Sequence, residues 1–299
     1  MKTEILKYLC YFDIFSHPLH KRELIRLCDT NENDLNQEID ALKNAGHCYE
    51  TQDFVSIRAE ILPLIEEREL KEKRAEKYFD KLPFYARLIR SFPFVKGIAI
   101  SGSLSKNVMH EDGDIDYFII TDKGRLWICR TFLVVFKKIF LLNSKKYFCV
   151  NYFVDEENLF IPDENIFTAI EIQYLLPVYN KEIISQFRSE NNWSTKFINP
   201  FERFIDVEEV KGKSWIGRFI QFVFKGKMGD RFDLYLMKFT YKKWEKKFKH
   251  FDAAKFNLTM RSNRGVSKHH PRDFQNRVLK EYAERMDRFE QNIQSTTVE

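Results

Sequence analysis

The sequence predicts an α+β protein, with a small β-sheet domain in the middle of the chain and helical parts on both sides of it. Glycine and proline are scarce, at 10 and 8 of 299 residues, which favours helices joined by short loops. Apolar runs with the strand pattern fall in the middle of the chain, at 94–100, 117–120 and 147–154. On either side, apolar residues recur at the three- and four-residue spacing of amphipathic helices.

The composition is that of a globular protein, with 44% hydrophobic and 31% charged residues, and the length allows two or three domains. The five cysteines are scattered and include no Cys-x-x-Cys pair, which favours a reducing compartment and argues against a zinc site. Charged residues interrupt the first apolar stretch, so it is not a secretory signal. No apolar run approaches the roughly 18 residues of a membrane span, and we expect a cytoplasmic protein with no membrane partner.

The N-terminal region, residues 1–60, is predicted to form three helices followed by a small β-hairpin. This order resembles a winged helix, a module whose third helix often lies in the DNA major groove. Here the third helix carries Asp34, Glu38 and Asp40 against Lys43 alone, a pattern that repels phosphate. We therefore expect this winged-helix-like module to have a structural or protein-contact role and not to read DNA.

The rest of the chain divides into a sheet domain at 61–160 and a basic helical domain at 161–299. A charged helix is expected to open the sheet domain and to end at Pro83, because proline lacks a backbone N–H donor. Within the sheet domain, a helix over 125–143 is apolar nearly all round, which predicts that it is buried against the sheet.

The most informative stretch lies between the first two predicted strands. The first strand leads into Gly102 and Ser103, and the second begins with Asp114 and Asp116. Because side chains alternate along a strand, the two aspartates project from one face. Paired carboxylates repel each other unless a cation lies between them, and oxygen ligands suit Mg²⁺. Gly102 lets the backbone approach a ligand, and a short helix over 104–109 would offer free N–H groups to a phosphate.

A plainer interpretation of the same stretch is a β-hairpin with a solvated acidic turn at 111–114. We favour the metal and phosphate site because strand, Gly-Ser pair, helix and acidic strand occur in the order that such a site requires.

Gly102, Ser103, Asp114 and Asp116 resemble the signature of the nucleotidyltransferase superfamily, the polymerase-β-like enzymes. The resemblance covers roughly 84–155. It implies a small mixed β-sheet domain in which the aspartates hold a metal and the Gly-Ser turn holds a nucleoside triphosphate. Lys106, one helical turn beyond Ser103, is placed to reach the same phosphates.

In the resembling family, a third strand beside the Asp pair usually carries a third carboxylate, which activates the attacking hydroxyl. The matching position here is Asn151, which cannot act as a base at neutral pH. Asp155, four residues further along the same alternation, is the alternative.

The resemblance implies an enzyme that transfers a nucleoside monophosphate from a triphosphate, with ATP the expected donor and Mg²⁺ the expected metal, and that releases pyrophosphate. The acceptor stays open between an aminoglycoside-like small molecule, an RNA end and a protein side chain. The alternative is a catalytically weakened regulatory module that binds a nucleotide or nucleic acid, with Asn151 marking the lost activity.

Charge is concentrated near the C-terminus. Residues 211–280 hold 19 lysines and arginines against 5 aspartates and glutamates, a net charge of +14 in a chain whose total is +5. Such asymmetry predicts that the segment meets an anion. It is expected to form one wall of the catalytic cleft; the competing interpretation is an outward face for nucleic acid.

Overall fold

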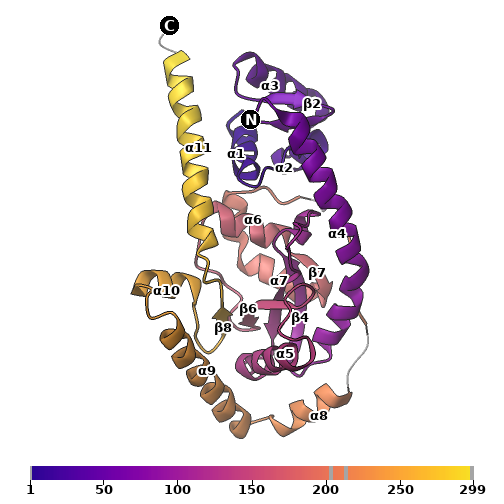
Figure 1. Cartoon of the computed structure of the whole chain (residues 1–299), viewed down its shortest axis with the longest axis vertical. Helices are drawn as coiled ribbons and strands as arrows, with labels where there is room; N and C mark the ends of the chain where they lie inside the picture. The colour runs from indigo at the N-terminus through magenta and orange to yellow at the C-terminus, as the bar shows by residue number, and fades with distance from the viewer. Residues whose placement is uncertain (1, 202–204, 212–214, 297–299) are drawn as a thin grey trace.

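The structure, a computed structural model, describes residues 2–201, 205–211 and 215–296. It confirms the predicted α+β class, with a central five-stranded mixed sheet and helices against both of its faces (Figure 1). A second, three-stranded sheet lies near the N-terminus. Among the described residues, no helix is both long and apolar enough to cross a bilayer.

The N-terminal elements are three helices and an antiparallel sheet of strand order β1-β3-β2. Their bounds are α1 Lys2–Asp13, β1 Leu19–His20, α2 Lys21–Cys28, α3 Glu32–Asn44, β2 Tyr49–Thr51 and β3 Phe54–Ser56. The Asn31 side chain caps α3 by accepting the backbone N–H of Asp34 at 2.9 Å. Leu24, Leu35 and Ile39 are fully buried between the helices. The likeness of these elements to a winged helix stays a prediction.

A single long helix, α4 Ile61–Arg90, joins these elements to the central sheet. The prediction that Pro83 ends this helix is wrong, because the helix continues through it to Arg90. A proline inside a helix costs about 3 kcal/mol, since one backbone hydrogen bond is lost. Leu82 and Ile89 flank Pro83 and are fully buried. Burying each contributes about 1.5–3 kcal/mol, which offsets that cost.

The central sheet has the strand order β7-β4-β5-β6-β8. Its strands are β4 Val95–Ser101, β5 Asp116–Thr121, β6 Cys149–Asp155, β7 Leu176–Tyr179 and β8 Val266–Lys268. β5 and β6 run parallel, joined through helix α5 Leu126–Phe140, whereas the other neighbouring pairs are antiparallel. Both edge strands come from beyond residue 160, so the sheet extends past the predicted 61–160 domain. The division of the chain into three domains stays a prediction.

Each face of the central sheet packs against its own set of helices. Tyr117 and Ile119 of β5 face the core that contains α5 and the end of α4. Phe118 and Ile120 alternate with them and face the other core, where the ring of Phe118 lies 4.7 Å from that of Phe187. The helices of this second face are α6 Ile166–Tyr174 and α7 Lys181–Glu190.

Helix α5 is only partly buried, so the prediction of burial nearly all round is wrong for its C-terminal half. Its first turn is enclosed on all sides, but later residues are buried along a single side, at Leu133 and Lys137. Ile139 and Phe140, near its end, are 62% and 68% exposed.

The C-terminal segment wraps around the sheet domain and then returns to the N-terminal helices (Figure 1). Its helices are α8 Trp215–Val223, α9 Lys227–Lys247, α10 Ala253–Thr259 and α11 Phe274–Thr296. Trp244 and Phe248 are buried against the α5 core, whereas Phe239 is 59% exposed. On α11, Arg285 bonds to Asp13 of α1 at 2.8 Å. The basic segment therefore packs on the sheet domain and supplies its edge strand β8.

Arg68 of α4 ties the N-terminal elements to the long helix. Its side chain is 4% exposed. The guanidinium donates to both carboxylate oxygens of Glu23, at 2.7 and 2.9 Å, and to Glu72 at 2.9 Å. It also donates to the carbonyl of Pro18 at 2.5 Å.

We predict that Arg68→Ala lowers the free energy of unfolding by about 3 kcal/mol, because it leaves the partly buried Glu23 carboxylate and the Pro18 carbonyl without their donor. Urea denaturation followed by circular dichroism measures the effect. Lys73→Ala, which removes an exposed cation from the same helix, is the control. Equal stability of the two variants would contradict this account of Arg68.

Candidate functional site

Three strands of the central sheet, β4, β5 and β6, have ends that lie side by side at the same end of the sheet. β4 ends at Ser101, which pairs with Asp116 at the start of β5, and β6 starts at Cys149, which pairs with Asp116 from the other side. The Gly102–Ser103 turn follows β4 directly. The turn and Cys149 therefore lie on opposite sides of Asp116.

Asp114, Asp116 and Cys149 form an acidic cluster that can hold a metal ion. One ligand atom from each lies within 4.8 Å of the others. Asp116 opens β5 and Asp114 lies in the loop just before it; both are partly buried, and Cys149 is buried. The structure thus brings the two carboxylates together, as the alternation of side chains predicts.

Cys149 is the member of this cluster that sequence reasoning missed. The predicted position, Asn151, is also close: its Nδ2 lies 3.5 Å from Asp116 Oδ1 and 2.8 Å from Cys149 Sγ. Asn151 is the extra residue where the β5–β6 register shifts. The spacing of the cysteines does not predict this role, because the neighbours of Cys149 in the cluster are aspartates from another part of the chain. The available signal was its place at the start of the strand beside the Asp pair.

Asp155, the alternative third carboxylate, lies away from the cluster. It pairs with Thr121 at the far end of β5, about 16 Å from Asp116 at the rise of ~3.3 Å per residue. Its carboxylate accepts the backbone N–H of Gly124 at 3.2 Å and the side-chain amide of Asn158 at 2.6 Å. Asp155 therefore shapes the loops at that end and is not a ligand of the cluster.

The cluster is electrostatically strained in the absence of a cation. Burial raises the pKa of Asp116 to about 7, and the neighbouring charge of Asp114 is the next largest cause. Burial, followed by the charges of Asp116 and Asp114, also raises the pKa of the Cys149 thiol, which is neutral near pH 7. A cation between the two carboxylates would reverse these effects on Asp116.

The Gly102–Ser103 turn depends on its glycine. Gly102 has φ of +69°, in the left-handed region that favours glycine, and a Cβ there would lie 3.0 Å from Asp116 Oδ2. Beyond Ser103 the chain makes a short 3₁₀ turn, η1 Leu104–Lys106, in place of the predicted helix over 104–109. Asn107, at φ of +61°, ends it.

A carboxylate from elsewhere in the chain lies on this turn. Glu171 of α6 accepts the backbone N–H of Gly102 at 3.1 Å and the ammonium of Lys106 at 2.7 Å. Two of the residues predicted to hold phosphate therefore already bind an anion. Sequence reasoning missed Glu171 because it lies 69 residues from Gly102 and reaches the turn from a separate helix.

The chemistry of the cluster fits a divalent cation. Mg²⁺ is commonly held by one or two carboxylates together with substrate phosphates, so Asp114 and Asp116 are a sufficient share from the protein. The sulfur of Cys149 is a softer donor, which suits a metal such as Zn²⁺ better.

An acid pair beside an anion-binding turn, on a small mixed sheet, defines a domain that can hold a metal and a phosphate together. Residues 86–206 match the family model described as the nucleotidyltransferase domain. This match agrees with the resemblance that the motif at Gly102, Ser103, Asp114 and Asp116 predicted. A search of curated proteins and a search of solved structures found no match.

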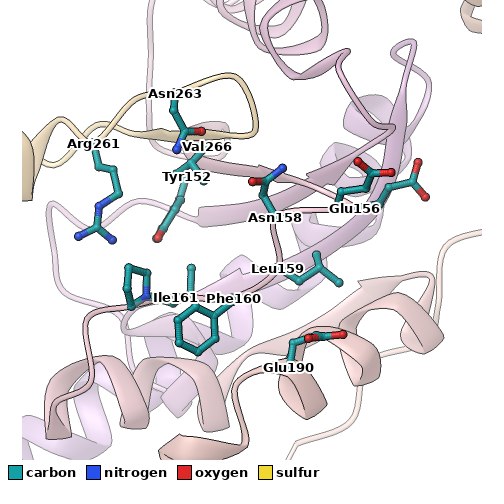
Figure 2. Close-up of a pocket in the computed structure, with 12 residues that line it drawn as sticks. Tyr152, Glu156, Asn158, Leu159, Phe160, Ile161, Glu190, Arg261, Asn263 and Val266 are labelled. Atoms are coloured by element: carbon teal, nitrogen blue, oxygen red, sulfur yellow. The ribbon is translucent and has the colours of Figure 1, made fainter.

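Two cavities lie near the sheet domain, and neither is lined by the Asp pair. One, of about 510 Å³, lies beyond the end of β6, where Tyr152, Asn158 and Arg261 line it (Figure 2). The other, of about 50 Å³, lies between the turn and the N-terminal elements, where Lys106 and Arg68 line it.

We predict that the apoprotein loses stability as the pH rises from about 4 to about 7. Over this range folded Asp116 holds a proton that the unfolded chain, with a carboxyl pKa of about 3.9, releases. Asp116→Asn should flatten this dependence and melt at a temperature roughly a few degrees higher at pH 7.5. Thermal melts in EDTA across this range measure both effects.

Glu111→Gln, at an exposed position of the same loop, serves as the control and should keep the wild-type pH dependence. A pH profile of Asp116→Asn that parallels the wild type would refute the raised pKa.

Proposed function

We propose that the protein is a nucleotidyltransferase that uses Mg²⁺ to move a nucleoside monophosphate from a triphosphate, with ATP the expected donor, to an acceptor. The observation that best supports this proposal is the Asp114–Asp116 pair beside a turn that already binds the carboxylate of Glu171, in the part of the chain that matches the nucleotidyltransferase domain. A small molecule, an RNA end and a protein side chain remain the candidate acceptors. The cytoplasm remains the expected location on the sequence grounds given above.

The proposed reaction joins an acceptor oxygen to the α-phosphorus of the donor. The bond from that phosphorus to the bridging oxygen breaks, pyrophosphate leaves with the electron pair, and the proton of the acceptor passes to solvent. Asp114 and Asp116 would hold the metal, which would supply polarisation of the α-phosphate and neutralisation of the leaving group. The backbone N–H groups of the turn, with Ser103 and Lys106, hold the terminal phosphates.

Asn151 has an orienting role in this proposal. Its amide contacts both Asp116 and Cys149, so it can hold the Asp116 carboxylate toward the metal. It cannot take a proton from the acceptor, because an amide is not a base at neutral pH.

A regulatory module that binds nucleotide without turnover is the competing function. The observation that favours it is that Asn151 stands where a third carboxylate is usual in the family, and that the nearby thiol of Cys149 is neutral near pH 7. Release of pyrophosphate from a triphosphate in the presence of Mg²⁺ separates the two functions, since a sensor binds the nucleotide and releases none.

We predict that Asp114→Asn and Asp116→Asn each reduce Mg²⁺-dependent pyrophosphate release by about 100-fold or more, because each removes a charged metal ligand. Circular dichroism should show an unchanged fold. Asp112→Asn, at an exposed site in the same loop, should keep its activity. Wild-type rates of pyrophosphate release in both Asp114→Asn and Asp116→Asn would contradict the assignment of these aspartates as metal ligands.

We predict that Glu171→Gln binds the Mg²⁺ complex of a non-hydrolysable triphosphate about 10-fold more tightly than the wild type. The Glu171 carboxylate lies where the phosphates would bind, and the amide keeps an acceptor atom but removes the competing charge. Isothermal titration calorimetry measures the affinity.

Glu182→Gln on α7, which is exposed, controls for the change in net charge. Weaker binding by Glu171→Gln would instead show that this carboxylate supports the nucleotide complex.

A further inference from the structure

Cys149 contributes its sulfur atom to the acidic cluster at the start of β5. This sulfur and one carboxylate oxygen from each of Asp114 and Asp116 lie within 4.8 Å of one another. Within the part of the chain that the structure describes, no other three cysteine, histidine or acidic side chains meet this spacing. Cys149 is fully buried, whereas both aspartates keep part of their surface exposed, so the cluster is open to solvent on the side of the carboxylates.

Backbone hydrogen bonds fix the sulfur beside the two carboxylates. Asp116 and Cys149 are direct partners in the parallel β5–β6 pair. Ile115, which lies between the two aspartates and is fully buried, donates its N–H to the carbonyl of Lys146 at 2.9 Å. Its own carbonyl accepts the N–H of Cys149 at 3.1 Å. The segment that carries the aspartates is therefore held on the segment that carries the cysteine, and the three ligand atoms stay close without a metal.

The side chain of Asn151 suits a sulfur ligand at position 149. Its Nδ2 lies 2.8 Å from Cys149 Sγ and 3.5 Å from Asp116 Oδ1. An amide at this point donates to the sulfur, whereas a carboxylate would repel both Asp116 and a thiolate. Donors placed outside the ligands in this way orient them toward the metal.

A thiolate at Cys149 would replace the third carboxylate of the resembling family in charge and in number of ligands. A thiol gives up its proton when it binds a metal, because the cation places positive charge beside the sulfur. The metal would then have three anionic ligands, the same number as from three carboxylates. The difference lies in their chemistry: thiolates favour Zn²⁺ and similar transition-metal ions, whereas Mg²⁺ takes oxygen ligands.

We propose that Cys149 is a ligand of the metal that Asp114 and Asp116 hold, and that it gives this site a preference for a thiophilic divalent cation, such as Zn²⁺, over Mg²⁺. The inference rests on the proposed function for the role of the metal and deepens it, because it states which cation occupies the site when both are present. A thiophilic cation would displace Mg²⁺, so its availability would regulate the site.

The test titrates Co²⁺, a thiophilic ion whose absorption spectrum reports its ligands, into metal-free protein. The wild type should develop a thiolate-to-cobalt charge-transfer band in the near ultraviolet as the site fills, and Mg²⁺ added at the same concentration should leave the band in place.

Cys149→Ser replaces the sulfur with an oxygen of similar size. This variant should lose the charge-transfer band and bind Co²⁺ about 10-fold or more weakly than the wild type. Its affinity for Mg²⁺, measured by calorimetry, should change by less than about twofold, since Mg²⁺ depends on the carboxylates. Cys28→Ser makes the same substitution at a cysteine outside the cluster and should match the wild type in every titration.

A second variant covers the case in which Cys149→Ser does not fold. The double variant Asp114→Asn, Asp116→Asn keeps all five cysteines but removes the charged oxygen ligands. It should also lose the charge-transfer band, because the thiolate alone does not hold the metal at this site.

Three results would overturn the proposal. One is a wild-type Co²⁺ spectrum without the charge-transfer band. Another is a band that survives in folded Cys149→Ser or in the double variant, because it would then come from another cysteine. The third is loss of the wild-type band when Mg²⁺ is added at the same concentration, which would refute the preference. Nucleotide takes no part in these titrations, so a failure to release pyrophosphate with Mg²⁺ would refute the proposed function and leave the assignment of Cys149 standing.

Discussion

The candidate site depends on holding two like charges together against their repulsion. Asp114 and Asp116 are brought close by the start of β5, which is hydrogen-bonded to a neighbour on each side and cannot easily swing away. Burial, and after it the charge of Asp114, raises the pKa of Asp116. A cation between the two carboxylates would be attracted to both of them, so the backbone pairing that holds them close also favours metal binding. The thiol of Cys149 completes the cluster without adding a third negative charge.

The sequence was sufficient for the parts of the site that are close along the chain. Gly102 and the Asp114–Asp116 pair lie in one short stretch, and strand alternation places the aspartates on a common face. The α+β class followed equally directly from the strand-like runs and helical periodicity. These features depend on local geometry, which a single sequence carries.

What the sequence could not supply depends on contacts between distant segments. Cys149 reaches Asp116 through the register of two parallel strands, and Glu171 reaches the turn from a separate helix. The burial of the charged side chains of Arg130 and Lys137 likewise depends on the packing of α5. Pro83 failed as a helix terminator for the same kind of reason, because tertiary burial on both sides of it outweighed a local preference.

The edge strand β8 is synthesised long after β6, the strand that it pairs with. β6 ends at Asp155, but its outer partner begins only at Val266, so a ribosome adding roughly 5–20 residues per second needs about 5–20 seconds to supply it. Until then β6 is an open edge with unpaired backbone groups, the kind of surface that joins other chains. The emerging polypeptide can assemble the turn and the Asp pair early, while the backbone hydrogen bond from His269 to Asn151 waits for nearly the whole chain.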